Sequence, residues 1–257
     1  MITNKDLVNK FSEIFKLRYP PIAFFYTENP PKEVYNPKKL SMENIPCIIQ
    51  FLNGVKSGET LVLGKKSRNL CPGGLSYLGF RKPITGIEAF LSKGIFDKDG
   101  KLIREGERFT KTPELAKELM NDIPFKPAPS DYAVFMPLDQ LGDDNDSALL
   151  VIFFVNVDQL TGLIQLSNYD TTNKARLGLG SDCQTIIREP LIELDKDEAP
   201  RAVVGMLSDI TGRRFIKTDE ATFTVSYKKL KEMYHNIDES FLSLNPWKLL
   251  QRRLSEK

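Results

Sequence analysis

Histidine and cysteine, the side chains that most often bind transition metals, are scarce in this chain of 257 residues, which has one histidine and three cysteines. A site built from several imidazoles is therefore excluded. His235 lies in a stretch rich in lysine and glutamate that is typical of an exposed helix, so a Cys–His catalytic dyad has no firm basis. An odd number of cysteines, in a chain long enough to bury a proper core, predicts free thiols in a reducing compartment, and we expect the protein to be cytoplasmic.

Long apolar runs and an excess of one charge are also missing. No run approaches the roughly 18 residues that a membrane helix needs, and residues Met1 to Asp6 contain no apolar leader segment. Lys and Arg total 36, Asp and Glu total 34, and the two signs are interspersed. We therefore expect neither a membrane nor a nucleic acid as a partner. Apolar residues at 41% and charged residues at 27% are ordinary for a soluble globular protein, and a homo-oligomer remains open.

Two familiar ligand-binding motifs are absent as well. The cysteines contain no C-x-x-C pair, so the sequence carries neither a zinc nor a ferredoxin signature. The basic loop after Leu63 superficially resembles a phosphate-binding loop. The first glycine of G-x-x-x-x-G-K-[ST] is missing, however, because Gly58 and Gly64 have the wrong spacing. ATP binding through such a loop is rejected on that basis.

Apolar periodicity and turn signals predict a mixture of helices and strands, which places the fold in the α+β, or mixed α/β, class. The expected strands are 22–27, 60–63, 132–138, 148–157, 202–209 and 221–226, and the expected helices include 3–19, 48–55, 86–93, 112–121 and segments beginning at Asp158, Tyr227 and Asn245. Pro124, Pro127 and Pro129 form a stiff connector. We expect a single domain, 1–257, whose loosely related halves, 1–123 and 130–257, surround a cysteine-lined site.

The segment Asn69 to Gly79 contains the sequence Cys71-Pro72-Gly73-Gly74 and is the strongest candidate for a functional loop. A proline directly after Cys71 suits the first position of a helix, and two glycines let the backbone approach a ligand closely. At such a helix start, unpaired N–H groups favour a thiolate over a thiol. The alternative is a tight turn that carries a small buried cysteine, since free cysteine is among the most buried residue types.

All three cysteines are predicted to lie in the first turn of a helix. Cys47 precedes the helical pattern that begins at Ile48, and Ser181 with Gln184 forms an expected capping box around Cys183. Thiolates gathered beneath converging helix ends would suit an iron–sulfur cluster or a metal ion, with Cys47, Cys71 and Cys183 as ligands and one coordination position open. Three separate buried thiols are the alternative.

Two glycine loops and an arginine complete the list of candidates. Gly73, Gly74 and Gly180 could bring backbone N–H groups to a bound cofactor, and Arg213 beside Gly212 could hold an anionic group, although a surface salt bridge is the commoner use of such an arginine. The leading hypothesis is a protein that binds a cluster or metal, with a redox or Lewis-acid role. The alternative is a non-enzymatic module that binds a small anionic ligand and whose cysteines are structural. No residue is assigned a catalytic role, and the small molecule is not identified.

The CPGG sequence followed by Leu78-Gly79-Phe80, together with Cys183, Glu189-Pro190, Gly205-Met206-Leu207, Arg213-Arg214 and Phe223-Thr224-Val225, resembles the domain of unknown function family 169. The resemblance extends from about Tyr19 to Lys231. It implies a soluble prokaryotic protein without a settled activity. The resemblance therefore supports the cysteines as candidate functional residues, but it does not indicate which reaction they would serve.

Overall fold

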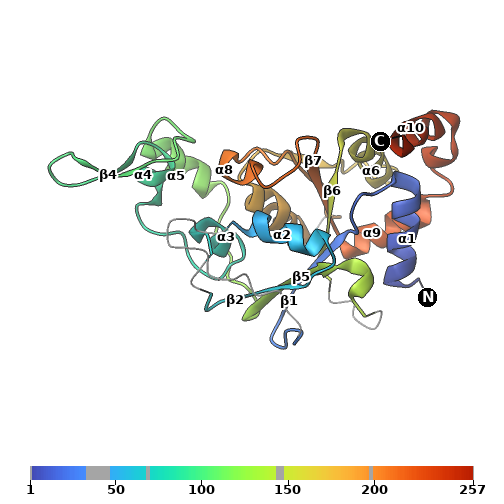
Figure 1. The fold of residues 1–257 in the computed structure, drawn as a ribbon, viewed down its shortest axis with the longest axis horizontal. Helices are drawn as coiled ribbons and strands as arrows, with labels where there is room; N and C mark the ends of the chain where they lie inside the picture. Colours follow the sequence, from blue (N-terminus) through green and yellow to red (C-terminus); the bar gives the residue numbers. More distant parts are fainter. Residues whose placement is uncertain (1, 33–46, 68–69, 143–147, 197–198, 257) are drawn as a thin grey trace.

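The computed structural model describes residues 2–32, 47–67, 70–142, 148–196 and 199–256, and in these ranges a central mixed sheet carries helices on both faces (Figure 1). The order of the strands in this sheet is β2-β5-β1-β6-β9-β8-β7. Neighbouring strands are antiparallel except for the pair β7 and β8, which is parallel. The strands of the sheet are β1 (Ile22–Thr27), β2 (Leu61–Gly64), β5 (Tyr132–Pro137), β6 (Leu150–Val155), β7 (Arg176–Gly178), β8 (Val203–Gly205) and β9 (Ala221–Ser226).

The helices of the described residues begin and end as follows: α1 (Asn4–Phe15), α2 (Ile48–Lys56), α3 (Pro72–Tyr77), α4 (Ile87–Leu91), α5 (Pro113–Asn121), η1 (Leu138–Gln140), α6 (Val157–Ser167), η2 (Gln184–Arg188), α7 (Glu189–Leu194), α8 (Ile210–Arg213), α9 (Tyr227–Asn236), η3 (Phe241–Ser243) and α10 (Asn245–Ser255). None of these helices is long and apolar enough to cross a bilayer.

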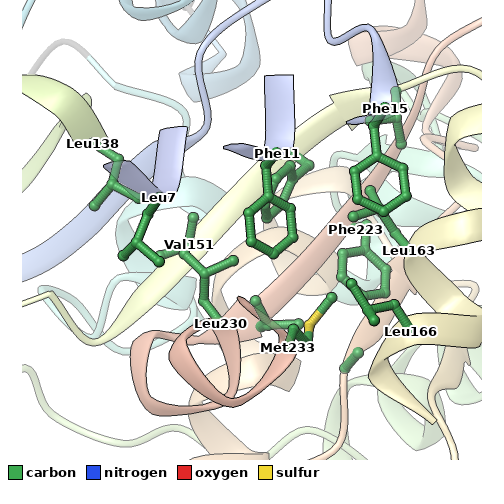
Figure 2. Packing of buried hydrophobic residues seen from close by; sticks show 14 of the residues in the cluster. Leu7, Phe11, Phe15, Leu138, Val151, Leu163, Leu166, Phe223, Leu230 and Met233 are labelled. Atoms are coloured by element: carbon green, nitrogen blue, oxygen red, sulfur yellow. The ribbon is translucent and has the colours of Figure 1, made fainter. Parts of the chain in front are cut away.

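One face of the sheet is covered by the two ends of the chain. Helices α1, α6, α9 and α10 lie together near both termini (Figure 1) and bury an apolar cluster against alternate residues of the strands. Phe11 stacks on Phe15 with ring centroids 5.7 Å apart and lies 5.8 Å from the ring of Phe153. Figure 2 shows α1, α6 and α9 meeting the sheet, with Leu7, Phe11 and Phe15 of α1 above Val151 and Phe223.

The other face of the sheet carries α2, α3 and η2. The remaining strand residues, such as Phe24 and Phe135, point to this side and pack against Leu52 and Ile186. Because successive strand residues point to opposite faces, strands that are apolar at nearly every position are buried on both sides, as the run through β6 predicts. Cys183 belongs to this second cluster and Cys47 packs against it.

The mixed α/β class is confirmed, and most predicted elements are found close to their expected bounds. Helix α6 is an exception, because Asn156 and not Asp158 caps it: Asn156 and Gln159 form a reciprocal capping box. In strand β9 the predicted inward residues Phe223 and Val225 are buried, but so are Thr222 and Thr224 on the opposite face. The expected helix entry at Ser41 to Pro46 lies outside the described residues.

A segment that we call the arm, residues 84–122, extends from the end of the molecule opposite to the termini (Figure 1). It contains α4, α5 and a two-stranded hairpin of β3 (Gly94–Phe96) and β4 (Leu102–Glu105). The sequence predicts only the tight turn between these strands, because every residue of β4 is exposed and no apolar alternation marks it. An open groove of about 650 Å³ on the arm is lined by residues of α5 and by Phe109.

Candidate functional site

Cys71 lies at the start of α3, as its sequence predicts, with Pro72 at the first helical position. The backbone N–H groups of Gly73 and Gly74 both point at its sulfur and donate hydrogen bonds to it. Burial nevertheless raises the pKa of the Cys71 thiol, because loss of hydration outweighs these two donors and the charge of Cys47 adds to the effect. The thiolate preference expected at this helix start is therefore not found: half-buried Cys71 favours the neutral thiol.

Cys47 and Cys183 form a hydrogen-bonded pair of thiols. Cys47 is the residue immediately before α2 and is half-buried, whereas Cys183 is buried immediately before η2. A hydrogen bond with Cys183 lowers the pKa of Cys47, and the backbone N–H of Ile49 adds to this effect against the opposing influence of burial. The same hydrogen bond, together with burial, raises the pKa of Cys183. Each of these two thiols therefore acts directly on the ionisation of the other.

Gly74 explains how the three segments approach one another so closely. A methyl group placed on it would lie 2.8 Å from the Cδ1 atom of Ile48, next to Cys47, and 3.9 Å from the sulfur of Cys183. Contacts below 3.0 Å are essentially never made by real Cβ atoms, so the absence of a side chain lets α3 rest on α2. A methyl group on Gly73 would lie 3.7 Å from the sulfur of Cys71. Both predicted glycines thus shape the thiol site, and their N–H groups serve Cys71.

Carboxylates also act on the thiols, although no sequence motif marks them as part of the site. Asp182 is 1% exposed; its Oδ1 accepts a hydrogen bond of 3.2 Å from the backbone N–H of Asp209, and its Oδ2 has no partner among the described residues. Burial raises the pKa of Asp182 to about 7, and the charge of Asp209 contributes. The charges of both aspartates oppose ionisation of Cys47. Their approach depends on the fold, because Asp182 and Asp209 are on separate segments.

The arm contributes a third carboxylate to the same region. Burial and the charge of Asp209 raise the pKa of Glu107, and the charge of Glu107 in turn raises the pKa of Cys71. Glu107 is fixed to the body of the arm by a backbone hydrogen bond of 2.8 Å to the carbonyl of Phe90. Carboxylates from three separate segments therefore act on the thiols and on one another, and no sequence motif predicts this.

A chain of polar side chains connects the thiol loop to the helices behind it. The hydroxyl of Tyr77 donates to Oε1 of Gln184 at 3.2 Å, and Nε2 of Gln184 donates to Oε1 of Glu189 at 2.9 Å. The expected capping box of Ser181 and Gln184 does not form, because the side chain of Gln184 is used in this chain and η2 begins without a side-chain cap. Gly180 lies against the amide group of Gln184, where a methyl group would overlap it.

Arg213 holds a turn. Its guanidinium donates to the carbonyl of Glu220 at 2.9 Å and to the carbonyls of Lys217 and Thr218 at 3.2 and 2.7 Å. These bonds tie α8 to the chain that leads into β9. Arg213 still acts on the site from a distance, because its charge lowers the pKa of Asp182 against the larger effect of burial.

The chemical nature of the three cysteine side chains suits a soft metal ion better than their arrangement in the structure does. Three free cysteines offer sulfur atoms, the donors that soft metals prefer, but across the described ranges no group of three or more His, Cys, Asp or Glu side chains is arranged as a ready metal-binding site. Cys183 is turned toward Cys47, and Cys71 is turned toward the N–H groups of its own helix. His235 is exposed on α9, where its ring contacts Tyr234.

These features define a mixed α/β protein in which three cysteines begin helices that follow one another in the chain order α2, α3 and η2. The chain matches the family DUF169, described as uncharacterised ArCR, over residues 10–236, and it belongs to that family. No curated protein and no solved structure matches the chain. The family resemblance of the CPGG loop and the later segments is thus confirmed, and it brings no assigned reaction.

Proposed function

We propose that Cys47, Cys71 and Cys183 form one site that binds a thiophilic metal ion or an iron–sulfur cluster, with a redox or Lewis-acid role. The observation that supports this proposal is the position of all three cysteines of the chain at the starts of α2, α3 and η2, near enough for the charge of one to act on another. Each sulfur interacts electrostatically with the other two.

Backbone donors support the same proposal. Thiolate ligands carry negative charge, and N–H groups of Ile49, Gly73 and Gly74 already point at two of the sulfurs. Such hydrogen bonds to sulfur tune the reduction potential of iron–sulfur clusters. Three cysteine ligands also leave one coordination position for a substrate or an external ligand, as catalytic zinc sites and open cluster corners do.

Binding would change the protonation of the site. The pKa values of Cys71 and Cys183 are raised in the metal-free protein, and thiols must lose their protons to become ligands. A bound metal would therefore replace the hydrogen bond between Cys183 and Cys47 and release protons. We expect the affinity to rise with pH.

The anionic-ligand module has less support. The N–H groups of Gly73 and Gly74 are used by the sulfur of Cys71, and the guanidinium of Arg213 is used by backbone carbonyls. The charged groups that influence the pKa of Cys47 are the carboxylates of Asp182 and Asp209. An anion placed beside this sulfur would be repelled by these carboxylates when they are ionised, which for Asp182 means above about pH 7.

The test is anaerobic purification followed by incubation with iron and sulfide, or with zinc, and measurement of bound metal, acid-labile sulfide and the visible spectrum. The parent protein should bind stoichiometric metal, and Cys47→Ser, Cys71→Ser and Cys183→Ser should each lose it. His235→Gln is the matched control, because its side chain is exposed and remote from the thiols, and it should bind as the parent does. A parent that stays free of metal under all these conditions contradicts the proposal.

A further inference from the structure

We propose that Cys47 and Cys183 also form a reversible dithiol–disulfide pair that exchanges with small-molecule disulfides. This activity goes beyond metal binding and needs two of the three thiols, so Cys71 is not required for it. The reduced protein holds all three cysteines as free thiols, which is the form that would react.

The contact between the two sulfurs is the first observation behind this inference. The two thiols lie within hydrogen-bonding reach of each other, so the sulfurs that would become bonded are already neighbours. The same closeness is seen at Gly74, where a methyl group would lie 3.9 Å from the sulfur of Cys183 and 2.8 Å from Ile48, the residue after Cys47. Both residues also belong to the same apolar layer, where Ile48 and Ile186 lie buried beside them. Forming a disulfide there would require no movement of distant segments toward each other.

The difference in accessibility is the second observation. Cys47 is half-buried, whereas Cys183 is 7% exposed. An accessible sulfur can attack an external disulfide, and a buried neighbour can then resolve the mixed disulfide while remaining protected from a second external molecule. The two positions therefore match the two roles that thiol–disulfide exchange needs.

Cys71 is placed differently. Its sulfur is held by the N–H groups of Gly73 and Gly74 in its own helix, and it influences Cys183 only through its charge. Two hydrogen bonds to the backbone hold it away from the contact between Cys47 and Cys183. We therefore expect Cys71 to remain a thiol when the pair is oxidised.

The reaction balances with a low-molecular-weight disulfide, RSSR, as the oxidant. The thiolate of Cys47 attacks one sulfur of RSSR, which breaks the S–S bond, forms a mixed disulfide with Cys47 and releases RS⁻. Cys183 then transfers its proton to RS⁻ and attacks the sulfur of Cys47, which forms the Cys47–Cys183 disulfide and releases a second RS⁻. Two electrons pass from the protein to the small disulfide, and the reverse reaction with excess RSH restores both thiols.

The experiment uses metal-free Cys71→Ser, in which only Cys47 and Cys183 remain, incubated with oxidised glutathione. We expect loss of both free thiols, a cross-linked peptide pair that joins Cys47 to Cys183 in the mass spectrum, and no bound glutathione at the end. Cys183→Ala should instead accumulate glutathione on Cys47, and Cys47→Ser should react at least ten times more slowly than Cys71→Ser. Far-ultraviolet circular dichroism checks that each variant is folded, and Cys183→Ser replaces Cys183→Ala if the latter is not.

Two results would overturn the inference. One is a stable mixed disulfide on Cys47 in the Cys71→Ser protein, which would mean that Cys183 does not resolve it. The other is a disulfide in the parent protein that contains Cys71 in place of Cys47 or Cys183. Because Cys71→Ser should lose metal but keep the exchange reaction, failure of metal binding and failure of the exchange reaction can be told apart in the same set of variants.

Discussion

Replacing Asp182 with asparagine should stabilise the protein at neutral and alkaline pH and have little effect in acid. Asp182 is buried beside the thiols, its Oδ2 has no partner among the described residues, and its pKa is raised from 3.8 to about 7, first by burial and then by the charge of Asp209. The folded protein therefore accommodates Asp182 as a neutral acid, whereas ionisation of this side chain lowers the free energy of unfolding. Asparagine has nearly the shape of the neutral acid and cannot ionise.

The magnitude follows from the difference between the folded and unfolded pKa values of Asp182. Below about pH 4 the acid is protonated in both states, so it costs nothing. Between about pH 4 and pH 7 the unfolded chain gives up a proton that the folded protein keeps, so stability falls as the pH rises. Above pH 7 the cost is complete and comes to roughly 4 kcal/mol, at about 1.4 kcal/mol for each pH unit between the two values.

Urea denaturation of the parent and of Asp182→Asn at a series of pH values from 4 to 8 measures this effect. The free energies of unfolding should be similar at pH 4 and should diverge by several kcal/mol, in favour of the variant, at pH 8. Asp219→Asn is a useful control of opposite sign, because a hydrogen bond from exposed Arg18 lowers the pKa of Asp219 and its loss should slightly weaken the fold at high pH. A difference between Asp182→Asn and the parent that does not change with pH would refute the reasoning.

Three further expectations concern the framework of the site. Lys56 and Glu220 form a buried ion pair of 2.8 Å, so Lys56→Met should cost about 3–5 kcal/mol in urea denaturation by leaving a buried carboxylate, whereas Lys56→Met with Glu220→Leu should recover most of that loss. Gly79 has a φ of 75°, and a methyl group on it would overlap backbone atoms of Lys126 and Ala128. Gly79→Ala should therefore lower the melting temperature far more than Gly100→Ala, because φ is also positive at Gly100 but the space around it is open. Equal losses of melting temperature in the two variants would contradict this expectation. Phe11→Ala should cost about 3–5 kcal/mol, because its ring is fully buried and a cavity would remain between α1 and β6, and a loss under 1 kcal/mol would mean that this part of the core repacks.

Local signals predict much of this fold because they act over a few residues. The capping box of Thr3 and Asp6 defines the start of α1, and Thr112 with Pro113 defines the start of α5, and both are found. The hairpin of β3 and β4 escapes prediction because its strands pack on no core, so their residues carry no periodic pattern. Where no apolar face is buried, the sequence has no apolar periodicity from which a strand could be predicted.

The candidate site also combines features that local sequence predicts with features that depend on how distant segments pack. That each cysteine begins a helix can be predicted, because proline and capping patterns are local. Which thiols touch cannot, because the contact of Cys47 with Cys183 depends on how α2 packs on η2. The same is true of Asp182 and Asp209, whose shared hydrogen bond arises from the packing of α8 and not from any motif. The pKa shifts of the site therefore depend on contacts between segments that are distant in the sequence.

The position of β1 in the sheet has a consequence for synthesis of the chain. Strand β1 lies between β5 and β6, which follow it by more than one hundred residues, so one of its edges lacks a partner until residue 137 has left the ribosome and the other until residue 155 has. Its apolar residues on both faces would meanwhile be open to pairing with other chains. The segment that ends at the proline-rich connector therefore cannot complete this sheet alone, and a nascent chain arrested there is the form that we expect to depend most on chaperones.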